Sequence, residues 1–247
     1  MKNRPTSKRI VLIMLAILSV VLYGADYRIL GTVRDTLSSF LGNLAFLPIY
    51  VIFVTLMIEQ TMKERERQTI MRKLNMVIGV FFSEVGNRLL KELSGYVVMG
   101  ADLRRELHVT PQWHDEDFQR ALDYLRSHDP AIDSSGRDKE HLKAFLTSRR
   151  GFLVGLLENQ NLMEHEQFTD LLWAVFHLVE ELDARESFDA MSKADTEHIN
   201  GDIKRAFGYL SREWLAYMKH LKQDYPYLFS LAVRLNPMVD NPDPRVY

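Results

Sequence analysis

The chain has 247 residues, of which 47% are hydrophobic and 26% are charged, and it contains no cysteine. The lack of cysteine excludes disulfides, thiolate nucleophiles, zinc ribbons and cysteine-ligated iron–sulfur clusters. Residues 1–73 carry 11 Lys and Arg against 5 Asp and Glu, a net charge of +6, whereas the remainder carries 20 against 28, a net charge of −8. Because a phosphate backbone needs a basic surface, the acidic C-terminal part argues against nucleic acid as a partner.

Two uncharged apolar runs lie near the N-terminus, at about residues 10–25 and 40–58. A helix needs about 20 apolar residues to cross a hydrocarbon core about 30 Å thick, and the second run is long enough. The first run is slightly short, but Lys8 and Arg9 can extend their charged ends to the head groups. We therefore predict an N-terminal tail and a two-helix transmembrane hairpin within residues 1–58. Two alternatives remain: a cleaved signal peptide in the first run, or two buried helices of a soluble protein.

The basic residues that flank the two runs predict the orientation of the hairpin. Lys2 and Arg4 precede the first run together with Lys8 and Arg9, and five more basic residues follow the second run. The connecting loop has only two basic residues, which two acidic residues offset. By the positive-inside rule both termini lie in the cytoplasm. We expect a multi-pass protein of the inner (cytoplasmic) membrane, with the lipid bilayer as a partner.

Residues 59–75 are predicted to continue the second membrane helix as a charged neck, since no proline occurs between Glu59 and Leu93. Glu59 lies four residues before a lysine, a spacing that favours an ion pair on a helix. The basic residues of the neck are candidates for contact with anionic lipid head groups, where each is worth about 1 kcal/mol. These residues are Lys63, Arg65, Arg67, Arg72 and Lys73. The alternative is an ordinary solvated helix face.

Residues 76–236 are predicted to form a cytoplasmic helical domain, and the Pro-rich tail at residues 237–247 is expected to be unfolded or to lie along the surface. Apolar residues recur at helical spacing, and no stretch alternates with a two-residue period for long enough to require a sheet. The elements expected in the domain are helices at about residues 111–127, 138–158, 164–184 and 195–223, a loop at 129–137 and a short apolar turn at 227–233. The predicted fold class is therefore all-α, a transmembrane hairpin followed by a multi-helix bundle.

Two features outside the membrane runs indicate contact surfaces. Residues 76–82 are apolar on every side of a helix, so they must be buried in their own domain, in a subunit interface or at the membrane surface. We expect Phe81 and Phe82 to lie in an interaction surface that forms a homo-oligomer. Trp173 lies on the side of its helix away from the apolar stripe, which suggests contact with a cytoplasmic protein partner unless another helix covers it.

Three residues stand out in or beside the second membrane run. Asn43 needs a hydrogen-bond partner in hydrocarbon, Pro48 can kink the helix, and Glu59 lies at the cytoplasmic end. In a symmetric oligomer, Asn43 and Glu59 would form polar rings along a pore. The alternative is ordinary helix packing with an acidic residue at the membrane interface.

His177, Glu180 and Glu181 form the most suggestive cluster, because histidine and carboxylate four residues apart on a helix can share a metal ion. His177 and Glu181 lie away from the apolar stripe of their helix, and Glu180 lies at its margin. Side chains of other helices are available to complete an iron or manganese carboxylate site. These are Glu84, His198, Asp202 and Glu213. The alternative is a solvated histidine–glutamate pair.

The chain has no motif for a known reaction. It contains no phosphate loop, no dinucleotide-binding fingerprint and no Gly-x-Ser-x-Gly elbow. His165 and Glu166 begin like the helix motif of zinc proteases, but position 169 is Thr where that motif needs a second histidine. We therefore predict no cofactor and favour a protein without enzymatic activity.

Three segments resemble a family of uncharacterised prokaryotic membrane proteins: Lys73–Gly79 (KLNMVIG), Phe168–His177 (FTDLLWAVFH) and Tyr225–Ala232 (YPYLFSLA). The resemblance covers most of the chain beyond the second membrane run. It implies the same layout of hairpin and helical domain, and it implies no activity. The sequence thus favours a membrane-anchored interaction or scaffold protein. The alternatives are a pore-forming or gating subunit of an oligomeric ion channel and a helical-bundle metal-binding enzyme.

Overall fold

The computed structural model describes residues 14, 17–22, 24–25, 27–28, 33–98, 100–159, 162, 165–189, 191–239 and 241–246. Within these ranges the chain is helical apart from turns, short connections and one isolated antiparallel bridge between Val97 and Ile132. This confirms the predicted all-α class. The chain divides into two compact units, residues 1–67 and 68–247.

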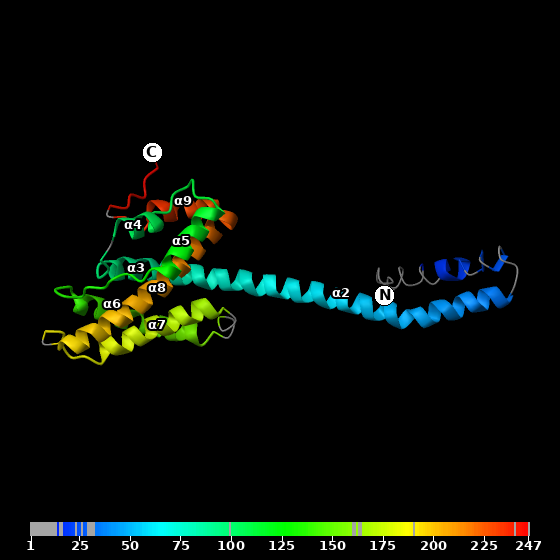
Figure 1. Ribbon diagram of the computed structural model, residues 1–247, viewed down its shortest axis with the longest axis horizontal. Helices are drawn as coiled ribbons and strands as arrows, with labels where there is room; N and C mark the ends of the chain where they lie inside the picture. Colours follow the sequence, from blue (N-terminus) through cyan, green and yellow to red (C-terminus); the bar gives the residue numbers. More distant parts are fainter. Residues whose placement is uncertain are drawn as a thin grey trace, which may run out of the picture. The chain divides into compact units, whose positions relative to one another are not determined.

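Helix α2, Val33–Phe81, begins in the first unit and contains Pro48 in its interior (Figure 1). Between Leu37 and Ile58, every large apolar side chain except that of Val54 is at least 46% exposed. By length and composition, the described residues contain one helix that is able to cross a membrane, within the continuous helical stretch Leu37–Ser94. None of its most apolar 18-residue window is buried.

The predicted first membrane run, residues 10–25, lies partly outside the described residues. Of this run, residues 14, 17–22 and 24–25 are helical, and the large apolar side chains among them are exposed. A second membrane-spanning helix is therefore not established, and the two-helix hairpin stays a prediction.

In the second unit, α2 passes directly into a π-helix, η1 (Phe82–Gly86), and then into α3 (Asn87–Ser94). The helices that follow are α4 (Ala101–Leu107), α5 (Asp115–Ser127), α6 (Lys139–Leu157), α7 (Glu166–Asp183), α8 (Lys193–Asp224) and α9 (Pro226–Arg234). Helix α8 is the central element, because it contacts η1, α3, α5, α7 and α9 (Figure 1).

The predicted helices agree with the structure to different degrees. Helices α6, α7 and α8 begin and end within two residues of the expected positions. Helix α5 ends as predicted but begins at Asp115 rather than at Pro111, because His114 and Asp117 form a capping box there. Helix α4 was not predicted, and the expected apolar turn at residues 227–233 is helix α9, with Pro226 in its first turn.

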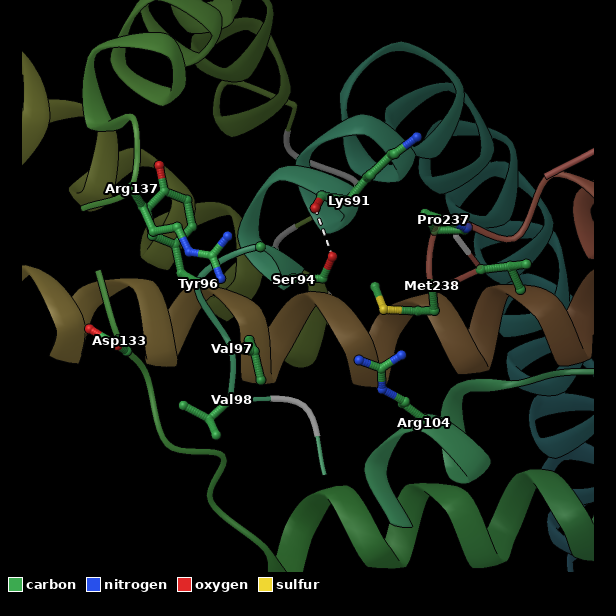
Figure 2. Close-up of a pocket in the computed structure, with 12 residues that line it drawn as sticks. Lys91, Ser94, Tyr96, Val97, Val98, Arg104, Asp133, Arg137, Pro237 and Met238 are labelled. Carbon is green, nitrogen blue, oxygen red and sulfur yellow. Dashed lines mark hydrogen bonds between the residues drawn. The ribbon is translucent and has the colours of Figure 1, made fainter. Parts of the chain in front are cut away.

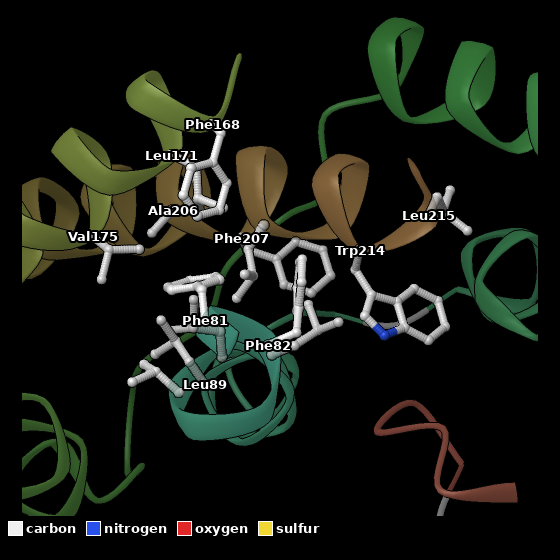
Figure 3. Packing of buried hydrophobic residues seen from close by; sticks show 14 of the residues in the cluster. Phe81, Phe82, Leu89, Phe168, Leu171, Val175, Ala206, Phe207, Trp214 and Leu215 are labelled. Atoms are coloured by element: carbon white, nitrogen blue, oxygen red, sulfur yellow. The ribbon is translucent and has the colours of Figure 1, made fainter. Parts of the chain in front are cut away.

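The core lies where the end of α2 and η1 meet α7 and α8 (Figure 3). Helix α8 buries an apolar stripe at helical spacing, as its sequence predicts. The buried members of this stripe are Ile203, Ala206, Phe207, Leu210, Trp214, Met218 and Leu221. The side chains of Phe81 and Phe82 face this stripe from the α2–η1 junction.

The expectation that Phe81 and Phe82 form an interaction surface is wrong, because both side chains are fully buried in the core of their own domain. The Phe81 ring meets the rings of Phe82 and Phe168 edge-on, with centroids 5.3 and 5.2 Å apart. Of the apolar segment 76–82, Met76 and Val80 remain exposed, at 67% and 51%. A subunit contact made by this segment would therefore use the opposite side of the helix.

Candidate functional site

The polar sides of α7 and α8 bring four possible metal ligands together. His177 and Glu181 lie one turn apart on α7, and His198 and Asp202 lie one turn apart on α8. The two helices pack against each other, so the two pairs meet across the helix–helix interface. One ligand atom from each of these four residues, the His–carboxylate cluster, lies within 4.8 Å of the other three.

Each imidazole of the His–carboxylate cluster faces both carboxylates. The Nε2 atom of His177 lies 3.7 Å from Glu181 Oε1 and 3.5 Å from Asp202 Oδ1. The Nε2 atom of His198 lies 3.3 Å from Glu181 Oε2 and 3.4 Å from Asp202 Oδ2. These separations are longer than the 2.7–3.2 Å of a normal N–H···O hydrogen bond.

The His–carboxylate cluster is open on one side and closed on the other. The side chains of His177 and His198 are 46% and 52% exposed, whereas that of Asp202 is only 3% exposed. The Asp202 Oδ2 atom is buried and has no hydrogen-bond partner. An ion from solvent can therefore reach the two imidazoles. Behind them lies Asp202 Oδ2, a carboxylate oxygen that accepts no hydrogen bond.

Each carboxylate of the cluster accepts a hydrogen bond from an arginine at one of its two oxygens. Arg185 donates to Glu181 Oε2 at 2.8 Å and also to Asp195, and Arg205 donates to Asp202 Oδ1 at 2.7 Å. The Arg185 bond is the largest reason that the pKa of the Glu181 carboxyl group lies below its usual range. Both carboxylates are thus oriented by a charged partner from outside the cluster.

The other acidic residues considered from sequence do not join the His–carboxylate cluster. Glu180, one residue before Glu181, pairs instead with Arg150 of α6 at 2.9 Å. Glu84 pairs with Arg149 at 3.6 Å. Glu213 is buried about three turns beyond Asp202 on α8, and this burial raises its pKa to about 7. Glu180 is therefore not one of the clustered side chains, whereas Glu181 lies beside His177, and metal binding by this pair stays a prediction.

Trp173 lies exposed on α7, with 58% of its surface accessible in the described structure. Its ring meets that of Phe176 edge-on at a centroid separation of 6.3 Å. The guanidinium group of Arg150 lies 5.4 Å from the centre of the Phe176 ring, and Arg150 also pairs with Glu180. An exposed Trp beside a partly buried Phe, with a polar rim, resembles the centre of a protein interface, and partner binding at Trp173 stays a prediction.

The predicted membrane-associated residues lie along α2. Asn43 and Pro48 fall within its exposed apolar part, and Glu59 forms the predicted i, i+4 ion pair with Lys63 at 2.7 Å. The five basic residues of the neck are all exposed on this helix. They are Lys63, Arg65, Arg67, Arg72 and Lys73. Pore formation and contact with lipid head groups stay predictions.

A pocket of about 530 Å³ that the sequence did not reveal lies between α3, α4 and residues 237–239 (Figure 2). Three cationic residues line it, Lys91, Arg104 and Arg137, against one carboxylate, that of Asp133. The backbone N–H of Ser135 donates to Asp133, and this bond holds the pKa of the carboxyl group below its usual range. The net positive lining favours an anion here, in contrast to the His–carboxylate cluster.

Comparison with known proteins identifies relatives along nearly the whole chain. The family described as "Uncharacterized protein MJ1433, C-terminal helical domain" matches residues 70–234, and "MJ1433, N-terminal helical domain" matches residues 2–62. The uncharacterized protein MJ1433 of Methanocaldococcus jannaschii is 43% identical over 229 residues, which cover 92% of each chain. No solved structure matches. These descriptions name helical domains and no activity.

Proposed function

The chain belongs to the MJ1433 family, and from that premise we propose that it is a membrane-anchored interaction protein that presents its helical domain to a protein partner at the inner membrane surface. The observation that carries the proposal is the exposed apolar surface of α2. The 22 residues from Leu37 to Ile58 contain no charged residue and expose nearly all of their large apolar side chains.

An exposed surface of this kind is unfavourable in water. Soluble monomers rarely expose a continuous apolar patch larger than a few hundred Å². Leu37–Ile58 is helical throughout, and at about 1.5 Å per residue it is about 33 Å long. This length matches a hydrocarbon core of about 30 Å. Transfer into lipid removes the apolar side chains from water and leaves the backbone groups hydrogen-bonded within the helix, except at Pro48, which has no N–H to donate.

The charges on either side support a cytoplasmic position for the helical domain. The neck beyond Glu59 carries five basic residues, and four more precede the first apolar run at residues 10–25. By the positive-inside rule this arrangement favours both termini on the cytoplasmic side, with residues 10–25 as the other helix of a hairpin. The basic residues of the neck then lie at the level of the lipid head groups.

The partner surface in this proposal is the aromatic pair on α7, in which Trp173 is exposed and Phe176 is partly buried. Trp173 and Phe176 are bordered by the Arg150–Glu180 ion pair, which gives an apolar centre with a charged rim. Trp and Arg are the residues most enriched among those that dominate binding energy in protein interfaces. Trp173 is 58% exposed, so a partner that covers it removes a large apolar surface from water.

Flotation of the full chain in a density gradient tests the anchoring. We expect the protein to float with lipid vesicles after an alkaline carbonate wash. Replacing both Leu47 and Phe53 by Arg places two charges near the middle of the helix, each costing about 2.5–3.5 kcal/mol, and should abolish flotation. The matched Leu47→Ala and Phe53→Ala double variant should still float. Recovery of the unaltered chain as a soluble, monodisperse protein without detergent would refute the anchoring.

The orientation and the partner surface have separate tests. A C-terminal reporter that is active only on the outer side of the membrane would overturn the cytoplasmic placement.

For the partner surface, a photo-reactive residue at position 173 should crosslink a second protein in intact membranes, and one at exposed Gln119 on α5 should not. Equal labelling from both positions, or labelling of the protein itself alone, would contradict the proposed partner site.

A further inference from the structure

We propose that the His–carboxylate cluster binds one divalent transition-metal ion, best fitted by Zn²⁺, which links α7 to α8 through His177, Glu181, His198 and Asp202. This inference is independent of the membrane anchoring, because the ligands all lie in the second unit. It concerns a structural ion rather than a catalytic one, since the protein supplies four ligands and a closed structural zinc site uses four.

The distances between the donor atoms match a shared ion better than they match ion pairs. Two ligands that each lie about 2.1 Å from a tetrahedral ion are about 3.4 Å from each other. Two of the nitrogen–oxygen separations in the His–carboxylate cluster join oxygens that no arginine bonds: His177 Nε2 lies 3.7 Å from Glu181 Oε1, and His198 Nε2 lies 3.4 Å from Asp202 Oδ2. A direct pair between imidazole and carboxylate closes instead to about 2.8 Å. His220 and Asp224 on the same helix do so, at 2.8 Å.

The buried oxygen of Asp202 is a second and independent observation. Its Oδ2 atom has no hydrogen-bond partner although it is inaccessible to solvent, and it faces His198 Nε2 at 3.4 Å. A buried carboxylate oxygen without a partner is costly, and native proteins leave few such atoms unexplained. An ion held among the four side chains would give this oxygen a ligand bond.

The two arginines complete the arrangement. Arg185 bonds Glu181 Oε2 and Arg205 bonds Asp202 Oδ1, so each carboxylate keeps its other oxygen, Glu181 Oε1 or Asp202 Oδ2, for the ion. Hydrogen bonds from outside the ligand shell that orient the ligands in this way are typical of metal sites. Replacing such a partner costs 10- to 100-fold in metal affinity in known sites.

The donor set also decides the class of ion. Two imidazole nitrogens and two carboxylate oxygens suit zinc and its neighbours, whereas Mg²⁺ and Ca²⁺ prefer oxygen ligands and higher coordination. The absence of cysteine from the chain excludes a thiolate site. The charge of the ion, +2, equals the charge of the two ligating carboxylates in magnitude. Zn²⁺ is therefore the probe of choice, with Ca²⁺ as the test of selectivity.

The experiment titrates Zn²⁺ into the full-length protein, purified in detergent and stripped with a chelator. We expect one equivalent of Zn²⁺ to bind and, at a free concentration 100-fold above Kd, to raise the thermal unfolding temperature by about 5–10 °C. Ca²⁺ at the same concentration should leave the temperature unchanged. Co²⁺ should bind in the same stoichiometry and give the intense visible absorption bands of a tetrahedral complex.

Variants assign the binding to the proposed residues. His177→Gln and His198→Gln should each weaken Zn²⁺ binding at least 10-fold, and they should leave the unfolding temperature of the metal-free protein within a few degrees because both side chains are half-exposed. His141→Gln is the matched control, since His141 is equally exposed and also faces a carboxylate, that of Glu92. Binding that survives either substitution, that is lost equally in His141→Gln, that is matched by Ca²⁺, or that is absent from the unaltered protein would overturn the proposal.

Discussion

Glu213 of α8 is a buried carboxyl group whose ionisation is expected to destabilise the folded domain. Its side chain is 3% exposed, and burial, only partly offset by Arg212, raises its pKa from 4.5 to about 7. Replacing it by Gln removes the ionisable proton and keeps the shape and polarity of the protonated acid. We therefore expect Glu213→Gln to stabilise the protein above pH 7 and to change little near pH 4.5.

The magnitude follows from the proton balance of folded and unfolded chains. Below pH 4.5 both states hold the proton, so Glu213 does not affect stability. Between pH 4.5 and 7 the unfolded chain releases the proton while the folded chain keeps it, and stability falls as pH rises. Above pH 7 both states are ionised and the loss is complete. A difference of about 2.5 pKa units, at about 1.4 kcal/mol each, amounts to about 3 kcal/mol.

Thermal unfolding of the full-length protein in detergent measures this loss, with tryptophan fluorescence as the probe because buried Trp214 adjoins the substitution. For a chain of this size, about 3 kcal/mol corresponds to an increase in unfolding temperature of about 6–12 °C in Glu213→Gln at pH 8. The increase should vanish at pH 4.5. Glu186→Gln, in an exposed loop, is the control and should change nothing at either pH. The same increase at both pH values, or a decrease at pH 8, would refute the reasoning.

Three further substitutions test the packing of the helical domain by thermal unfolding. Gly86→Ala should destabilise it by about 1–3 kcal/mol, because the added Cβ would lie 2.5 Å from Cδ1 of Phe82; Gly155→Ala, where no atom lies within 4 Å, should be neutral or stabilising. Asn236→Ala should cost about 1–3 kcal/mol, since its buried amide donates to the Leu107 carbonyl. Arg185→Ala should lower the unfolding temperature by several degrees, because the bonds from this arginine to α7 and α8 are lost.

Helices with strong apolar periodicity and standard caps could be predicted to within two residues. Helix α6 begins after Asp138, whose carboxylate accepts from the backbone N–H of His141, and α8 begins after Ser192, whose hydroxyl accepts from that of Asp195. Helix α5 was placed too early because Pro111 is typical of a first helical turn, whereas the capping box that begins the helix forms between His114 and Asp117. Helix α4 has seven residues, too few to establish a period.

The error on Phe81 and Phe82 has a different origin. Periodicity showed that residues 76–82 had no polar side and so required burial, but it did not indicate which surface would cover each residue. In the structure the helix changes to a π-helix at Phe82, and both rings enter the core of their own domain. A one-turn change of helical type of this kind has no reliable sequence pattern, so the choice between core and subunit interface lay beyond the sequence.

Only part of the His–carboxylate cluster could be predicted from the sequence, namely the spacing of histidine and acid within one helix. Three histidines are followed four residues later by an acid, at His177, His198 and His220. The spacing is the same in all three, yet His220 closes on Asp224 at 2.8 Å and also contacts Asn75. The pairs His177–Glu181 and His198–Asp202 do not close in this way. The packing of α7 on α8 places each of these pairs beside the other.

Packing between helices, and not spacing within one, therefore determines which of these pairs can hold an ion. The same reasoning separates Glu180 from Glu181. One residue turns a helical side chain by about 100°, which directs Glu181 to α8 and Glu180 to Arg150 on α6. Apolar stripes predict that α7 and α8 each bury one side. They do not determine the rotation of each helix, or the register between the two helices, to within one residue. A ligand set drawn from two helices requires that register, and here the structure supplies it.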